Sequence, residues 1–263
     1  MLALKQGLSL NTIKTLGGGG AAFSNVYSLD FDGVDDYVNF GDADVFSINS
    51  SGANRGFSLS CWIKTTGGQD EIISKLDGSN LEYRFEVGRN GKLEFVVFGD
   101  NNGSVAQGLK LNTPIVGDNN WHHVAVSFDL ADASTSLSLF VDGVEYNDTD
   151  AGAAYSSSGT WAAAANTSAP LNMGRRGTNS WFYEGNIDEV AIFDNVMTAA
   201  QATAIYNSGT PTDLSGESNL VGYWRNGDTA GTSVYPTIED YSSNSNDGTM
   251  TNMVSGDIVT VVP

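Results

Sequence analysis

The sequence predicts an all-β chain: a jelly-roll sandwich of two antiparallel sheets with one short helix near residues 198–206. Three observations support this fold class. Several segments alternate apolar and polar residues with a period of two. Tight-turn dipeptides separate these segments, and a single helix-start pattern interrupts them.

The alternating segments are predicted to be strands with one face on a core. In residues 57–64, FSLSCWIK, the apolar residues Phe57, Leu59, Cys61 and Ile63 share one face. Residues 81–87 and 137–142 alternate in the same way. Asn-Gly and Asp-Gly pairs suit the positive φ angles of hairpin turns. They occur at Asp32-Gly33, Asp77-Gly78, Asn90-Gly91 and Asp142-Gly143.

The one helix is predicted from its capping residues. Thr198 is a candidate N-cap, and Gln201 three residues later completes the capping-box pattern. Good helix formers follow, and Gly209 can end the helix.

The chain is predicted to have three parts: residues 1–20, 21–212 and 213–263. The first is an N-terminal arm ending in the glycine joint Gly17–Gly20, which is either packing material or a tether to another chain. The second is the jelly roll. The third is a C-terminal extension, read as a supplementary strand or an attachment segment.

Composition narrows the classes of partner. The chain has 31 acidic and 12 basic residues and a formal net charge of −19, which argues against binding nucleic acid or anionic membranes. No apolar run approaches the roughly 20 residues of a membrane span, and we expect no secretion signal at the start. The single cysteine, Cys61, excludes an internal disulfide framework.

The two histidines of the chain, His122 and His123, are adjacent. Val124, Val126 and Phe128 mark their segment as a strand, in which neighbouring side chains point to opposite faces. The pair therefore cannot chelate one ion locally, and both residues are predicted to be structural.

Several strings together resemble laminin-G-like, concanavalin A-like jelly-roll domains. They are YSLDFDGVDDYVNFGD, FSLSCWIKTT, NNWHHVAVSFD, LSLFVDGVEY, LNMGRRG and FYEGNIDEVAIFDNVMTAAQATAIYNSG, across about residues 26–209. The string LVGYWRNGDTAGTSVYPTIEDYSSNSNDGTMTN is similar to one that often opens such a domain, although it comes last in this chain. The arm and this tail also resemble structural proteins of tailed marine phages.

Catalysis is not predicted. Jelly-roll hydrolases carry Glu-x-Asp-x-x-Glu on one strand, whereas Asp188, Glu189 and Asp194 have a different spacing. Glu82 and Glu86 share a face but stand roughly 13 Å apart, too far for a glycosidase pair. With Arg84 between them, they are interpreted as a surface charge ladder.

A structural calcium is the cofactor that the resemblance implies. It points to Asp32 and Asp35 at the first glycine turn, with Asp188 nearby; Asp30, Asp36 and Asp42 are close in sequence. Calcium takes six to eight oxygens from carboxylates and carbonyls. The alternative is an acidic turn in solvent.

A ligand or partner surface is expected where aromatic residues gather in loops beside arginines. Aromatic faces with planar polar groups bind sugars, and the same residues concentrate at protein contacts. The alternative is that these loops bury their own rings. The candidates are Tyr155, Trp161, Arg175, Arg176, Trp181 and Tyr183, with Phe182 and Asn179 beside them.

The resulting functional prediction is a non-enzymatic structural or adhesion protein of a virion exterior, of the capsid decoration or fibre type. Residues 1–20 or the tail would dock on other virion proteins, and the loops could reach cell-surface glycans. A stand-alone carbohydrate-binding module is the alternative, and a polysaccharide hydrolase is the disfavoured third reading. Homo-oligomers through sheet edges remain open.

Overall fold

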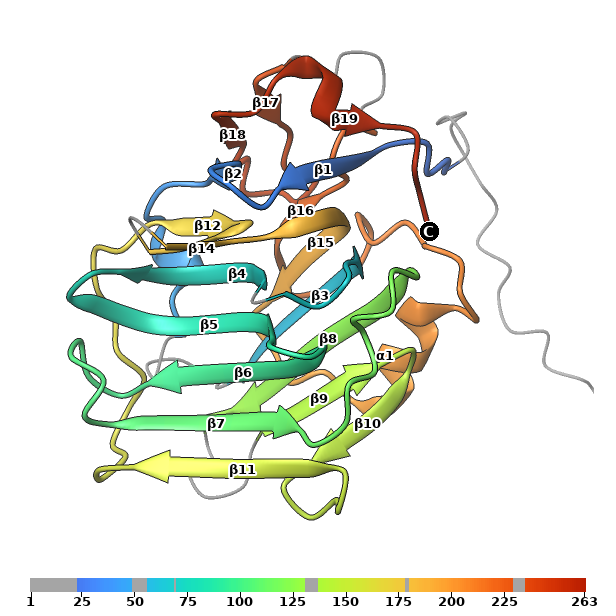
Figure 1. Cartoon of the computed structure of the whole chain (residues 1–263). Helices are drawn as coiled ribbons and strands as arrows, with labels where there is room; N and C mark the ends of the chain where they lie inside the picture. Colours follow the sequence, from blue (N-terminus) through green and yellow to red (C-terminus); the bar gives the residue numbers. More distant parts are fainter. Residues whose placement is uncertain (1–22, 49–55, 69, 131–136, 178–179, 229–234) are drawn as a thin grey trace, which may run out of the picture.

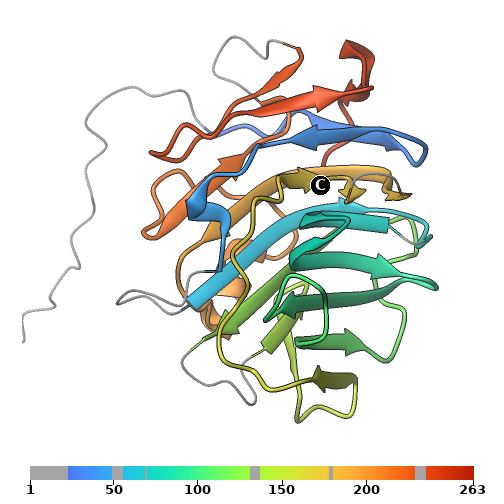
Figure 2. The same ribbon diagram turned by 90° about the vertical axis from the view of Figure 1, so that its left-hand side faces the viewer.

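The computed structural model describes residues 23–48, 56–68, 70–130, 137–177, 180–228 and 235–263. These residues form two large antiparallel sheets packed face to face, with one short α-helix (Figures 1 and 2). The predicted all-β sandwich is confirmed. The N-terminal arm and glycine joint, residues 1–20, lie outside the described residues.

Sheet A has eight strands in the order β10-β9-β8-β3-β15-β1-β19, and β16 also pairs with β15. A register shift after Asp188 divides β15. Its first half pairs with β1 and its second half with β16. The strands are β10 (Val144–Asn147), β9 (Leu137–Val141), β8 (His122–Asp129), β3 (Gly56–Lys64), β15 (Glu184–Phe193), β1 (Ser28–Asp32), β19 (Ile258–Val259) and β16 (Leu220–Trp224).

Sheet B has nine strands in the order β11-β7-β6-β5-β4-β12-β2-β18-β17. A separate hairpin, β13 (Arg175–Arg176) and β14 (Ser180–Phe182), lies beside it. The strands are β11 (Ala153–Ser158), β7 (Ala106–Leu111), β6 (Lys92–Phe98), β5 (Asn80–Gly88), β4 (Asp70–Asp77), β12 (Leu171–Met173), β2 (Tyr37–Asn39), β18 (Gly248–Thr251) and β17 (Thr237–Ile238).

The predicted hairpin between β5 and β6 has the expected turn. Asn90 and Gly91 have positive φ angles of 69° and 71°, and the Gly91 N–H donates to the Gly88 carbonyl oxygen (3.1 Å), which closes the turn around Arg89 and Asn90. Across this hairpin, Phe85 lies opposite Phe95 and Val87 lies opposite Leu93. Both pairs face the core.

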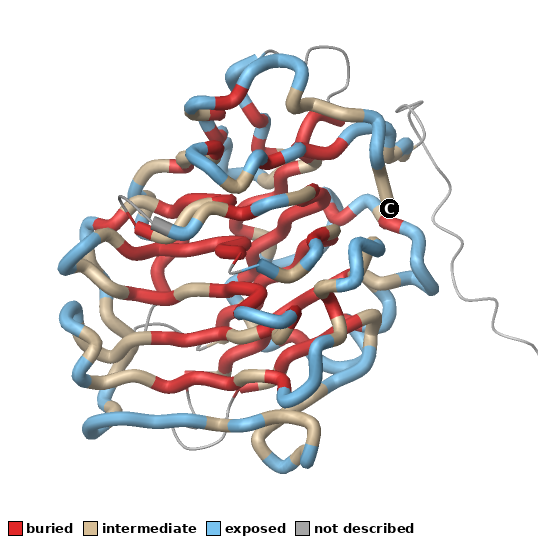
Figure 3. Tube along the Cα trace, in the orientation of Figure 1, coloured by how far each residue is buried: buried red, intermediate tan, exposed pale blue. Residues whose placement is uncertain are grey.

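The core residues lie on strands of both sheets, and buried residues run along the central strands in Figure 3. Apolar residues at alternate positions of opposed strands are fully or almost fully buried, as the period-two pattern predicts. They include Leu59, Cys61 and Ile63 of β3, Tyr83 and Phe85 of β5, and Val124, Val126 and Phe128 of β8.

The helix α1 (Ala199–Tyr206) begins as predicted, with a full capping box between Thr198 and Gln201. It ends at Asn207, which is left-handed. No described helix is long and apolar enough to cross a bilayer.

The outer face of sheet A is not solvent-exposed, which corrects the expectation of half-buried strands. Trp62 and His123 lie 5.9 and 6.2 Å from Tyr206 of α1, between ring centroids. A second apolar cluster packs beside them: Ala125, Phe140, Ala191, Phe193, Met197, Ala202, Leu214 and Tyr223. Sheet A is therefore buried on both faces in this region.

The C-terminal segment, residues 213–263, contributes strands to both sheets. β16 and β19 extend sheet A, while β18 pairs with β2 and carries β17 at the end of sheet B. Trp224 is fully buried, 4.2 Å from Phe40 between ring centroids. Two further short 3-10 turns are η1 (Asp44–Phe46) and η2 (Ser255–Asp257). The segment thus completes the same sandwich as the preceding residues.

Candidate functional site

The hairpin β13–β14 places three of the predicted ligand residues, Arg175, Arg176 and Trp181, beside β4 of sheet B. The Ser74 hydroxyl donates to the Arg175 carbonyl oxygen (2.7 Å), and Arg175 Nη2 donates to Asn172 Oδ1 (3.1 Å). These bonds fix the hairpin to the two strands beneath it. Its register shifts between Arg175 and Arg176.

Trp181 is the exposed aromatic residue of this hairpin, with 40% of its surface accessible. The Arg176 guanidinium carbon lies 4.2 Å from the Trp181 ring centroid, and that of Arg175 lies 3.6 Å from the Tyr37 centroid. Trp181 has a φ of 64°, which costs a bulky residue on the order of 1–3 kcal/mol. Each arginine of the hairpin thus lies over an aromatic ring, and of these two aromatic residues Trp181 is exposed and Tyr37 is half-buried.

Beneath the hairpin, Glu71 of β4 lies opposite Glu86 of β5. Glu86 accepts from Arg84 Nη1 (2.9 Å), and Arg176 Nη1 lies 3.7 Å from it. Burial, and then the neighbouring Glu86 carboxylate, raise the pKa of Glu71 well above its ordinary value. Burial therefore favours the protonated form of the Glu71 carboxyl group.

The predicted surface ladder of Glu82, Arg84 and Glu86 is wrong, because Glu82 and Glu86 are 1% and 3% exposed. Glu82 pairs instead with Lys75 (2.8 Å), which also contacts Asp42 (2.7 Å) and the Ala169 carbonyl. The alternation along β5 correctly placed both glutamates on one face. It could not show that distant segments cover that face.

The remaining predicted aromatic residues belong to the core. Tyr183 is fully buried, and its ring lies edge-on to Phe31. Tyr155 and Trp161 are half-buried and pack against the core cluster, Trp161 edge-on to Phe128 at 5.8 Å. Asn179 lies outside the described residues. The structure therefore places Arg175, Arg176 and Trp181 on one hairpin, and places the side chains of the other three candidates in or against the core.

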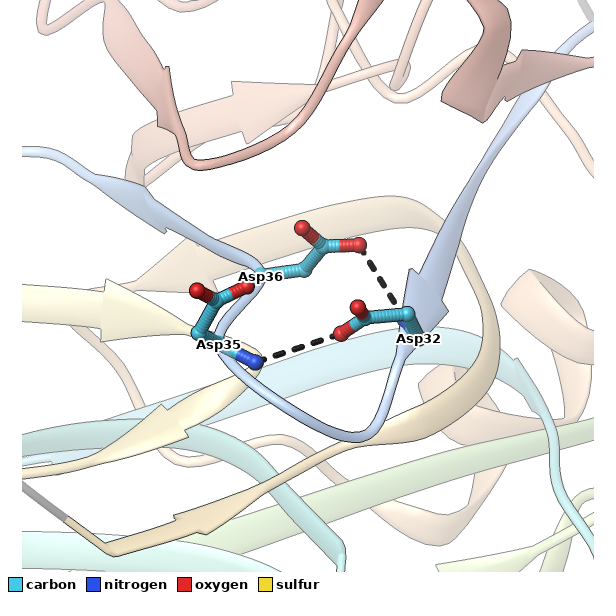
Figure 4. Close-up of side chains that lie close together, drawn as sticks. All are labelled: Asp32, Asp35 and Asp36. Atoms are coloured by element: carbon cyan, nitrogen blue, oxygen red, sulfur yellow. Dashed lines mark hydrogen bonds between the residues drawn. The ribbon is translucent and has the colours of Figure 1, made fainter.

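The carboxylates of Asp32, Asp35 and Asp36 meet at the turn after β1, each offering an oxygen within 4.8 Å of the others (Figure 4). Asp32 Oδ1 accepts from the backbone N–H groups of Val34 and Asp35, and Asp36 Oδ2 accepts from that of Asp32. Burial, followed by repulsion from the neighbouring acids, raises the pKa of Asp36 to about 6. Oxygen ligands of this kind fit calcium.

Asp188 does not join these aspartates. On β15 it lies four residues beyond Glu184, which is the partner of Asp32, so the two are roughly 13 Å apart along the strand. Asp188 is fully buried, accepts from Asn25 Nδ2 (2.9 Å), and has its pKa raised well above the ordinary value by burial. Asp36 occupies the third place in the cluster.

Next to Asp188, Glu189 sits at the β15 bulge with a φ of 49°. It accepts a hydrogen bond from the Tyr223 hydroxyl and contacts Arg225 (3.3 Å). Burial raises its pKa above the ordinary value. Both carboxyl groups are nearly buried and already partnered, so they act as links between β15 and the segments packed against it.

The histidines project to opposite faces of β8, as predicted. His122 Nδ1 contacts Asp142 (2.8 Å) and its Nε2 contacts Asp118 (3.1 Å). His123 Nε2 contacts the Ser60 hydroxyl (2.7 Å) under α1, and its side chain is fully buried. The two imidazoles do not approach each other, and each makes structural contacts within the fold.

These features define a lectin-like jelly-roll domain. The chain belongs to the family Laminin_G_3 of the concanavalin A-like lectin/glucanases superfamily, whose model matches residues 32–203. No curated protein matches the chain significantly.

Several solved structures are similar to this chain. One from Bacteroides ovatus, described as a candidate carbohydrate binding protein, has a TM-score of 0.57 and 16% identity; the match covers 91% of this chain but 63% of that one. The heptameric SAP-like pentraxin of Limulus polyphemus has a TM-score of 0.44 and 13% identity, over 69% and 82% of the chains. Mouse laminin α1 domains LG4-5 have 0.45 and 13%, over 72% and 48%.

Proposed function

We propose that this chain is a non-enzymatic adhesion module that binds carbohydrate at the β13–β14 hairpin. The observation that carries the proposal is the exposed Trp181 ring backed by Arg176, with the guanidinium carbon 4.2 Å from the ring centroid. A carbohydrate-binding description of one structure of the same fold agrees with this choice.

The arrangement suits a sugar for physical reasons. A pyranose ring presents apolar C–H groups that pack on an aromatic face, and hydroxyls that need planar hydrogen-bonding partners. Trp181 offers the ring, and the guanidinium group of Arg176, which lies over that ring, offers hydrogen-bond donors beside it. Because β4 and β12 anchor the hairpin, little conformational freedom is lost on binding.

A glycan array probed with the wild-type chain and with Trp181→Ala tests this proposal. We expect saturable binding by the wild type and loss of it in the variant. The matched control is Tyr235→Ala, which removes another aromatic residue of similar exposure (42%) away from the hairpin. Equal binding by all three proteins would exclude the hairpin as the site.

The virion context stays part of this proposal. The arm of residues 1–20 with its glycine joint, and the sequence resemblance to phage structural proteins, are what support a decoration or fibre-type role on a virion exterior. Particles assembled with a chain lacking residues 1–20 should lose this protein. Full occupancy on such particles would remove the arm as the anchor.

A hydrolase has less support than a binding module. The Glu71–Glu86 pair is nearly buried beneath Arg84 and Arg176, so a glycosidic bond has no access to it in this conformation. The acids Asp188 and Glu189 are likewise buried in internal contacts. A glycosidase needs two accessible carboxyl groups on either side of the scissile bond.

We also propose that the turn at Asp32, Asp35 and Asp36 holds a structural calcium. The three carboxylates converge, and Asp32 and Asp35 are exposed, so water can complete the coordination. The ion would offset the mutual repulsion that contributes to the raised pKa of Asp36. It would tie β1 to β2 at the edge nearest the Arg175–Tyr37 pair.

A further inference from the structure

Strand β11 is the terminal strand of sheet B. One side pairs along its whole length with β7, from Ala153 opposite Leu111 to Ser158 opposite Ala106. No described strand pairs with the other side, which forms the lower border of the sheet in Figure 1. Ala154 and residues Ser156 to Ser158 are exposed.

The backbone groups on that outer side can be assigned from the register. The Asn112 N–H donates to the Gly152 carbonyl (2.8 Å), so the backbone polar groups of Gly152 point toward the β7 side. In an antiparallel strand the backbone N–H and C=O groups of successive residues alternate between the two sides, so those of residues 154, 156 and 158 also point toward β7. Tyr155 and Ser157 therefore direct their N–H and C=O groups away from the sheet.

This edge lacks the usual protection against pairing. Natural edge strands are blunted by charged side chains, by proline or by shortness. Among the other terminal strands, β10 carries the exposed Glu145, and β17 and β19 each have only two residues. β11 has six residues, AAYSSS, with no charge and no proline, in a chain with 31 acidic residues.

We propose that two copies of this chain associate through β11, antiparallel about a two-fold axis at Ser156, so that sheet B continues through both. Tyr155 of each copy lies opposite Ser157 of the other, and each of these two pairs exchanges two N–H···O bonds. A second copy suits this edge because the same small, uncharged residues meet across the axis and no like charges oppose each other.

The strength of the association follows from these contacts. Because only backbone hydrogen bonds between two short strands are proposed to carry the association, the dimer is weak and its population depends on concentration. The net charge of −19 on each copy opposes it, so added salt should strengthen it by screening. Because the axis is perpendicular to the sheet, both β13–β14 hairpins would lie on the same face of the joined sheet.

Sedimentation equilibrium of the full chain over a range of concentrations tests the proposal. The wild type should shift from monomer to dimer mass. Ser157→Pro removes an outward N–H without touching the ladder to β7, and should weaken dimerisation at least about tenfold, which corresponds to about 1.4 kcal/mol. Ser157→Thr keeps the N–H and should dimerise like the wild type.

A charge pair gives a second readout that does not depend on proline. Ser156→Lys and Ser156→Glu each place like charges opposite each other at the axis, so each alone should be monomeric, and their mixture should form a heterodimer. A wild type that stays monomeric at all concentrations, or a dimer that neither Ser157→Pro nor the Ser156 variants weaken, would overturn the proposal.

Discussion

His122 and His123 are consecutive in the sequence, yet their environments shift their pKa values in opposite directions. The hydrogen bond that His122 donates to the Asp142 carboxylate raises the pKa of His122, whereas burial lowers the pKa of His123 to about 4. Strand geometry causes this difference, because it sends one imidazole to a carboxylate-lined strand end and the other beneath α1.

The first prediction concerns His123 and acid stability. Because the folded-state pKa is depressed below the unfolded value near 6.5, its contribution is present above about pH 6.5 and is lost as the pH falls toward 4. The shift corresponds to a decrease of about 3 kcal/mol in the free energy of unfolding between neutral and acid pH. His123→Gln should lack this loss, measured by urea denaturation at pH 7.5 and 4.5.

His122→Gln is the matched control for that experiment. The raised pKa of His122 means that its contribution is full below about pH 6.5 and is lost as the pH rises through the folded-state pKa. The two variants should therefore change the pH dependence with opposite sign. Identical pH profiles for wild type and His123→Gln would contradict the assignment.

The second prediction concerns the buried ion group around Lys75. Lys75→Met should destabilise the fold by about 3–5 kcal/mol, since it leaves the nearly buried Glu82 carboxylate without its cation. Lys110→Met is the control, because Lys110 is 42% exposed beside Glu94 and should cost less than about 1 kcal/mol. Chemical denaturation measures both changes in the free energy of unfolding. Comparable destabilisation by the two variants would contradict the prediction.

The third prediction concerns calcium at the Asp32–Asp36 turn. Calcium at a hundredfold excess over its dissociation constant should stabilise the wild type by about 2.7 kcal/mol, and a chelator should reverse the rise in melting temperature. Below about pH 6 the effect should weaken, since a protonated Asp36 must lose its proton to bind the ion.

Two variants separate this site from general acidic effects. Asp35→Asn removes one member of the cluster and should abolish the response to calcium. Asp44→Asn removes an exposed acid outside the cluster and should keep it. A wild-type melting temperature that does not respond to calcium would exclude the site.

Local patterns were sufficient for the strands and the helix. Alternation in β3, β5 and β8 reflects which side chains face the core, and the Thr198–Gln201 capping box fixes the start of α1 through its own hydrogen bonds. Both signals act over a few residues. For that reason they can be recognised without knowledge of the tertiary contacts.

The strand faces that point away from the core are also buried in places, and this could not be predicted, because the segments that cover them lie far along the chain. Trp62 is covered by Tyr206, and Glu86 by Arg176. The same dependence on distant segments explains why some site residues were chosen wrongly from the sequence. Asp36 was visible beside Asp35, but no pattern ranked it above Asp188. Tyr183 and Trp181 are two residues apart, a spacing that predicts a shared strand face, yet Tyr183 is buried and Trp181 is exposed. The positive φ of Trp181 (64°) breaks the alternation, and the sequence pattern does not show it.

Calorimetric titration with a polysaccharide that the wild type binds tests the carbohydrate site most directly. Trp181→Ala should weaken binding by at least about 30-fold, about 2 kcal/mol, and Arg176→Lys should weaken it less, because it keeps the charge but loses the planar stacking group. Unchanged affinity in Trp181→Ala, with the fold intact, would contradict the account.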